Sequence, residues 1–135
     1  MKEIIQFNNS IKLCVSENNE WFLKHNEKLI PINDFTISLL PLLEEEYETF
    51  LLEISKKDVS EEIFKSFPLI NLLKYPFDNR RLYWSECAMN WVEKQQNTDD
   101  LKEWSKDISL DWMPQKLKHR FFKKFMTGSR YKSLK

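Results

Sequence analysis

Residues 2–32 decide the fold, and they read KEIIQF NNS IKLCV SENNE WFLKH NE KLIPI. The runs IIQF, IKLCV, WFLKH and KLIPI are rich in Ile, Val, Phe and Trp, the side chains that strands favour. Asn dominates the segments between them, and asparagine tolerates the left-handed backbone of tight turns where glycine is missing. The pattern predicts an antiparallel meander of three or four strands over residues 1–33. Because so small a sheet is marginally stable alone, it must pack on helices.

From Asp34 onward the apolar residues recur at helical spacing. Asp34 is the predicted N-cap of a short helix that ends near Pro41. Residues 44–57 form a clear amphipathic helix, whose predicted buried stripe is Tyr47, Phe50, Leu51 and Ile54.

Cap residues divide the rest of the chain into further helices. Ser60 begins one that Pro68 splits, Asp78 caps one that runs to about residue 96, and Thr98 begins a short one. The last helix starts near Pro114 and stops before Gly128. The predicted fold class is α+β, a β-meander packed on five or six helices over residues 34–127. All 135 residues are expected to form one domain, with a frayed basic tail at 128–135.

The composition excludes several kinds of protein. Gly128 is the single glycine, so the glycine-rich loops of P-loop and dinucleotide sites are absent. Cys14 and Cys87 are too few for a disulfide framework and too far apart for a zinc knuckle, so both are expected to be buried thiols. No apolar run approaches the roughly 20 residues of a membrane span, and residues 1–10 lack a signal-peptide core. The expected location is the cytoplasm.

A net charge of zero conceals a strong polarity along the chain. Residues 112–135 carry six Lys and two Arg with no acidic residue, a charge of +8. The remaining 111 residues carry 13 basic and 21 acidic side chains, a charge of −8. The neutral sum is therefore a large charge dipole along the sequence.

No motif in the sequence predicts a catalytic, cofactor-binding or metal-binding residue. His25 and His119 lack metal-ligand spacing with each other or with a cysteine, and no glycine-framed nucleophilic serine occurs. A pair of carboxyl groups that acts as acid and base needs two environments that separate their pKa values, whereas clustered glutamates on one exposed helix face share one solvated environment. They are a solvated face, a docking surface for a basic partner or, as the third alternative, catalytic groups. The residues predicted for that acidic face are Glu45, Glu46, Glu48, Asp99, Asp100 and Glu103.

The C-terminal helix is amphipathic. Its apolar side is formed by Leu117, Phe121, Phe122, Phe125 and Met126, and its basic face by Lys116, Arg120, Lys123 and Lys124. Such a helix could dock on the core through its phenylalanines, lie along nucleic-acid phosphates, or rest on an anionic membrane surface.

Three classes of function are compatible with these features. The first is a module that binds one protein partner. Its acidic body would attract a partner that has a basic surface. The second is nucleic-acid binding through the helix at 114–127 and the tail. The third is an enzyme whose residues meet only in the folded chain, such as Cys87 with His25 or His119.

In general character the chain resembles the small cytoplasmic immunity proteins that bacteria make against secreted toxins. Those proteins too are often single domains of this size, with few glycines, many Asn, Ile and Lys residues, and no enzymatic motif. The resemblance implies a non-enzymatic inhibitor that covers the active site or substrate surface of a cognate toxin or nuclease domain. The +8 end departs from the acidic character expected of a nuclease inhibitor.

Overall fold

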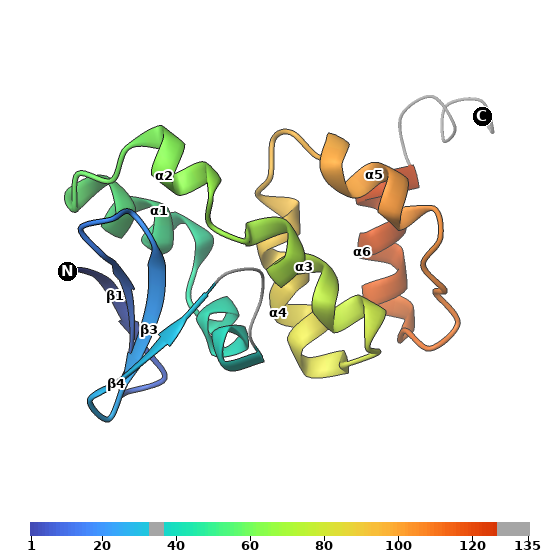
Figure 1. Cartoon of the computed structure of the whole chain (residues 1–135). Helices are drawn as coiled ribbons and strands as arrows, with labels where there is room; N and C mark the ends of the chain where they lie inside the picture. The colour runs from blue at the N-terminus through green and yellow to red at the C-terminus, as the bar shows by residue number, and fades with distance from the viewer. Residues whose placement is uncertain (33–36, 127–135) are drawn as a thin grey trace. The chain divides into compact units, whose positions relative to one another are not determined.

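The computed structural model describes residues 1–32 and 37–126. It opens with a four-stranded antiparallel sheet in the order β1-β2-β3-β4, as predicted (Figure 1). The strands are β1 (Lys2–Phe7), β2 (Ile11–Val15), β3 (Trp21–His25) and β4 (Lys28–Pro31). Sequential strands are neighbours, so β1 and β4 form the two edges of the sheet.

Asparagines make the turns of this sheet, as expected from the sequence. Asn8 and Asn9 between β1 and β2, and Asn19 between β2 and β3, all have φ between 48° and 65°. The two-residue turn from β3 to β4 places both Asn26 and Glu27 at positive φ, at 50° and 67°. This left-handed geometry matches the twist of the flanking strands.

One face of the sheet forms the core of this part of the chain. The register pairs Leu13 with Leu23 and Val15 with Trp21, and all four side chains are buried. The other face carries Lys12, Cys14 and Lys24. A bulge lies between Glu3 and Ile5 of β1 and interrupts the alternation there.

Three helices follow the sheet: η1 (Ile37–Glu44), α1 (Tyr47–Lys56) and α2 (Glu61–Lys65). The predicted cap Asp34 lies outside the described residues. The first helix does not end near Pro41, because it is a 3₁₀ helix with this proline inside it. Ser60 caps α2 as predicted, since its hydroxyl accepts a hydrogen bond from the Ile63 backbone N–H at 3.2 Å.

An aromatic cluster joins the sheet to α1 and α2. Trp21 packs edge-on against Phe67 with ring centroids 5.0 Å apart, and Phe50 lies 5.4 Å from Phe67. The buried Trp21 indole donates to the Ile63 carbonyl at 3.1 Å and to Ser66 Oγ at 3.0 Å. These bonds satisfy the one polar atom of an otherwise apolar side chain.

The remaining helices are α3 (Leu69–Asp78), α4 (Leu82–Glu93), α5 (Asp99–Ser105) and α6 (Gln115–Met126). The prediction that Asp78 caps α4 is wrong. Asp78 is the last residue of α3, and Arg81 occupies the N-cap position of α4. The Asp78 carboxylate instead accepts a hydrogen bond from the Trp104 indole at 2.8 Å.

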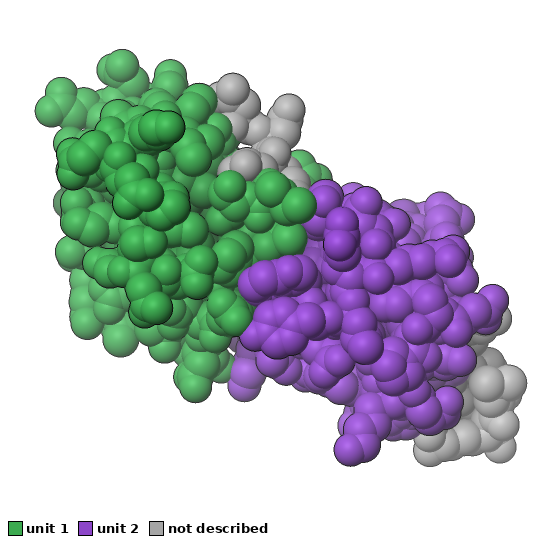
Figure 2. Space-filling view, turned by 90° about the horizontal axis from the view of Figure 1, so that it is seen from below, with its two compact units in different colours: residues 1–72 green, residues 73–135 purple. Residues whose placement is uncertain are grey.

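The chain divides into two compact units, residues 1–72 and 73–135, which we call the N-terminal unit and the C-terminal unit (Figure 2). Phe77, Trp104, Phe121 and Phe125 form the aromatic core of the C-terminal unit, with ring centroids 4.7 to 6.3 Å apart. Helix α3 crosses the boundary between the units. The single-domain expectation stays a prediction, and the tail at 128–135 lies outside the described residues.

Candidate binding surfaces

The six residues predicted for the acidic face fall in different units. Glu45, Glu46 and Glu48 surround the first turn of α1 in the N-terminal unit. Asp99, Asp100 and Glu103 lie on α5 in the C-terminal unit. They are therefore two acidic clusters, each at the start of a helix, where the positive end of the helix dipole favours carboxylates.

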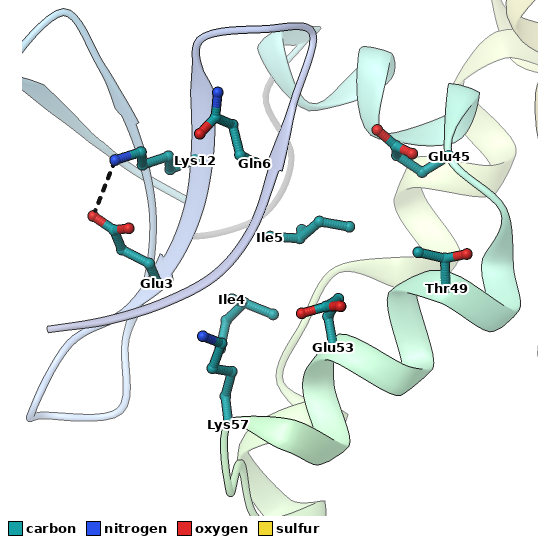
Figure 3. A pocket seen from close by; sticks show the side chains of 9 residues that line it. All are labelled: Glu3, Ile4, Ile5, Gln6, Lys12, Glu45, Thr49, Glu53 and Lys57. Carbon is teal, nitrogen blue, oxygen red and sulfur yellow. Dashed lines mark hydrogen bonds and ion pairs between the residues drawn. The ribbon is translucent and has the colours of Figure 1, made fainter.

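A hollow of about 310 Å³ separates β1 from α1 (Figure 3). Ile5 projects from β1 toward α1, and Glu53 projects from α1 toward the strand (Figure 3). Glu45 and Thr49 line the helix side and Gln6 the strand side. Of the six predicted acidic residues Glu45 lines this hollow, and Glu53, which was not among the predicted residues, lines it as well.

Lysines accompany the carboxylates of the hollow. Lys12 Nζ lies 3.3 Å from Glu3 Oε1, and Lys56 Nζ lies 3.4 Å from Glu53 Oε1. Lys57 also lines the hollow. The lining of the hollow is therefore polar and carries side chains of both charges.

Helix α1 exposes apolar side chains beside this acidic cluster. Phe50 and Ile54 are buried, as predicted, and Tyr47 is half-buried. The prediction that Leu51 is buried is wrong, because 37% of it is exposed, and 53% of Leu52 is exposed. Leu51 lies 60° from Ile54 around the helix, at the margin of the side that the core covers. Leu52, the next residue in the sequence, indicates that the apolar side chains of this helix extend beyond its buried side.

The basic face of α6 is partly occupied by contacts within the C-terminal unit. Arg120 donates to both carboxylate oxygens of Glu93, at 2.6 and 3.0 Å, and to the Asn90 side chain at 2.7 Å. Lys124 Nζ donates to the backbone carbonyls of Glu93 at 3.4 Å and Gln95 at 2.8 Å. Two of the four predicted basic residues thus hold the C-terminal end of α4, while Lys116 and Lys123 are exposed.

The Arg120–Glu93 contact also shifts the titration of both groups. The hydrogen bond from Arg120 and its positive charge lower the pKa of the Glu93 carboxyl, against the opposing effect of burial. The same hydrogen bond raises the pKa of the Arg120 guanidinium. Both groups are therefore held in their charged forms at neutral pH.

The apolar side of α6 docks on the core of its unit. Leu117, Phe121 and Phe125 are buried, while Phe122 and Met126 are half-buried. Phe121 packs against Phe77, with ring centroids 5.2 Å apart. This packing is the first of the three arrangements that the amphipathic pattern allowed.

Possible metal ligands do not gather into a site within the described ranges. No group of three or more His, Cys, Asp or Glu side chains there could hold a metal ion. Cys14 is buried, and burial is the main cause that raises the pKa of its thiol, which disfavours the reactive thiolate. Cys87 was expected to be buried, but its side chain is half-buried.

Comparisons with known proteins assign no family to this chain. Its sequence and structure match no protein family, no characterised protein and no solved structure. Within residues 1–32 and 37–126, none of the helices has both the length and the apolar character needed to cross a bilayer.

Proposed function

We propose that this chain is a non-enzymatic protein-binding module, an inhibitor of the immunity type that binds and blocks a toxin or nuclease domain in the bacterial cytoplasm. The observation that carries the proposal is the acidic, leucine-exposing surface of the N-terminal unit at α1. Glu45, Glu46 and Glu48 surround the start of a helix on which Leu51 and Leu52 are exposed. Carboxylates beside exposed apolar side chains are suited to a basic protein surface.

The charge of the N-terminal unit supports this choice of partner. Residues 1–72 contain 7 Lys and Arg against 13 Asp and Glu, a net charge of −6. Residues 73–135 contain 14 basic against 8 acidic side chains, a net charge of +6. An acidic unit raises the rate at which a basic partner is encountered, and nuclease surfaces that bind phosphates are basic.

Nucleic-acid binding through α6 is the alternative function, and the contacts of α6 favour it less. Phosphate binding needs several cations that can face one backbone at once. Arg120 and Lys124 already bind Glu93 and the end of α4. The exposed side chains of the predicted basic face are Lys116 and Lys123, and His119 lies next to Lys123 around the helix.

A pull-down from a lysate of the source organism separates these functions. The immobilised chain is incubated at moderate salt, with and without added nuclease. We expect one protein in stoichiometric amount, with capture unaffected by nuclease and reduced by salt. If nucleic acid is recovered instead, and is lost when the salt concentration is raised, the result would support nucleic-acid binding through α6.

Charge reversal tests which acidic cluster binds the captured partner. Changing Glu45, Glu46 and Glu48 together to Lys should lower the association rate constant about tenfold or more at low salt, because charge complementarity acts mainly on the association rate. The matched control changes Asp99, Asp100 and Glu103 to Lys, which applies the same charge change at the start of α5. Surface plasmon resonance gives both rates. Equal slowing by both variants, or by neither, would contradict the choice of α1.

A further inference from the structure

Helix α1 is apolar on two separate sides. Its inner side carries Phe50 and Ile54, which are buried in the N-terminal unit. At 100° per residue, Leu52 lies directly opposite the midpoint of that side. Single exposed leucines are ordinary on protein surfaces, but α1 exposes two adjacent ones, of which 37% and 53% are accessible.

The outer side of α1 is also acidic. Around the helix, Glu48 falls between Leu51 and Leu52, next to Ser55. Glu44, Glu45 and Glu46 precede the helix directly, and the unit as a whole has a net charge of −6. Apolar side chains next to carboxylates have a defined complement, apolar side chains next to lysine and arginine.

We propose that the outer face of α1, formed by Glu48, Leu51, Leu52 and Ser55, is the docking surface for a partner protein with lysine and arginine around an apolar patch. This inference rests on the proposed function and deepens it by naming the surface and the chemistry of the partner. Leu52 is the anchor, because it is the more exposed of the two leucines.

Charge favours this occupant over an anionic membrane. A second copy of the chain also exposes apolar side chains beside arginines, Leu82 and Tyr83 next to Arg80 and Arg81, and it is therefore a separate outcome of the test below. An anionic membrane would be repelled by the glutamates beside the leucines. A basic protein surface satisfies both the leucines and the glutamates.

Two pairs of variants test the docking surface in the pull-down. Leu52→Asp is compared with Leu29→Asp, the same change at a leucine in β4 that is 50% exposed. Glu48→Lys is compared with Glu17→Lys, the same change at an exposed position between β2 and β3. Capture of the partner by the full-length chain is quantified by mass spectrometry, and circular dichroism checks the fold of each variant.

We expect Leu52→Asp to reduce capture about tenfold or more, the effect of removing one buried interface anchor. Glu48→Lys should reduce it less and mainly at low salt, while Leu29→Asp and Glu17→Lys should capture as the wild type does. If Leu52→Asp loses its fold, Leu52→Gln replaces it.

The failures of the docking surface and of the proposed function are distinguishable. Full capture by folded Leu52→Asp would overturn the docking surface and leave the protein-binding function standing. Capture of no stoichiometric protein by the wild type would overturn both. A wild-type dimer in sedimentation velocity that Leu52→Asp dissociates would replace the proposed partner with a second copy of the chain.

Discussion

At the scale of single residues, Arg120 shows how a predicted binding residue can serve the fold instead. Its guanidinium makes a two-pronged contact with Glu93 and a third bond to Asn90. Planar pairing of this kind is stronger than a single lysine contact. The side chains of Arg120 and Glu93 are still 31% and 41% exposed, so solvent screens the pair and limits its contribution to stability.

Replacing Arg120 with Met should lower the free energy of unfolding by roughly 1 kcal/mol at pH 7, the upper end for exposed pairs. Glu93 has a lowered pKa when folded, so its contribution is complete above its unfolded pKa of about 4.3 and is lost as the pH falls through the folded pKa. The difference between wild type and Arg120→Met should therefore shrink between pH 7 and pH 2. Urea unfolding at both pH values measures it.

The exposed Lys116 on the same helix provides the control for this prediction. Lys116→Met should change stability little at either pH, since it removes a cation without breaking the contact with Glu93. A difference for Arg120→Met that is the same at pH 2 as at pH 7 would contradict the role given to the Glu93 charge.

At the scale of elements, the turn between β3 and β4 and the end of α4 are stabilised by different means. The turn depends on backbone geometry, with Asn26 at φ 50° and Glu27 at φ 67°. The end of α4 depends on a distant side chain, because Lys124 Nζ donates to the carbonyl of Glu93, the last residue of α4, at 3.4 Å, and to that of Gln95 just beyond it at 2.8 Å. Carbonyls at the end of a helix have no partner within the helix, and a lysine can supply one.

Glu27 is the residue of this turn that is least suited to its conformation. A left-handed backbone costs a residue with a Cβ about 1 kcal/mol, while glycine adopts it freely. Glu27→Gly should therefore raise the free energy of unfolding by up to about 1 kcal/mol, and Asn26→Ala should lower it. Thermal and urea unfolding of both variants test this. If Asn26→Ala raised the free energy of unfolding, the turn would not need a residue that favours the left-handed backbone conformation.

At the scale of the whole molecule, the zero net charge is the sum of two opposite units. The N-terminal unit carries −6 and the C-terminal unit +6. In residues 1–32 and 37–126 most of the charged side chains are exposed. A protein of this kind presents an acidic surface and a basic surface although its net charge is zero.

This polarity should be visible in chromatography. At pH 7 and low salt we expect the chain to be retained by both an anion exchanger and a cation exchanger. Changing Lys116 and Lys123 to Gln should weaken retention on the cation exchanger alone. Passage of the wild type through both columns would mean that the opposite charges mask each other.

The sequence alone determined the features that depend on local chemistry. Asparagine in short segments between apolar runs predicted the meander and its left-handed turns, and Ser60 predicted the start of α2. Helical periodicity predicted that Phe50 and Ile54 are buried, and that Leu117, Phe121 and Phe125 are buried. These predictions succeed because backbone conformation and helix caps depend on residues within a few positions of each other.

Only the tertiary structure decided which side chains meet across long separations. It brings Arg120 to Glu93 and Trp104 to Asp78, and it leaves Leu51 partly exposed although its spacing predicts burial. It also opens the hollow between β1 and α1. The physical reason is that periodicity shows which side of a helix is apolar, whereas burial and pairing depend on which other elements cover that side.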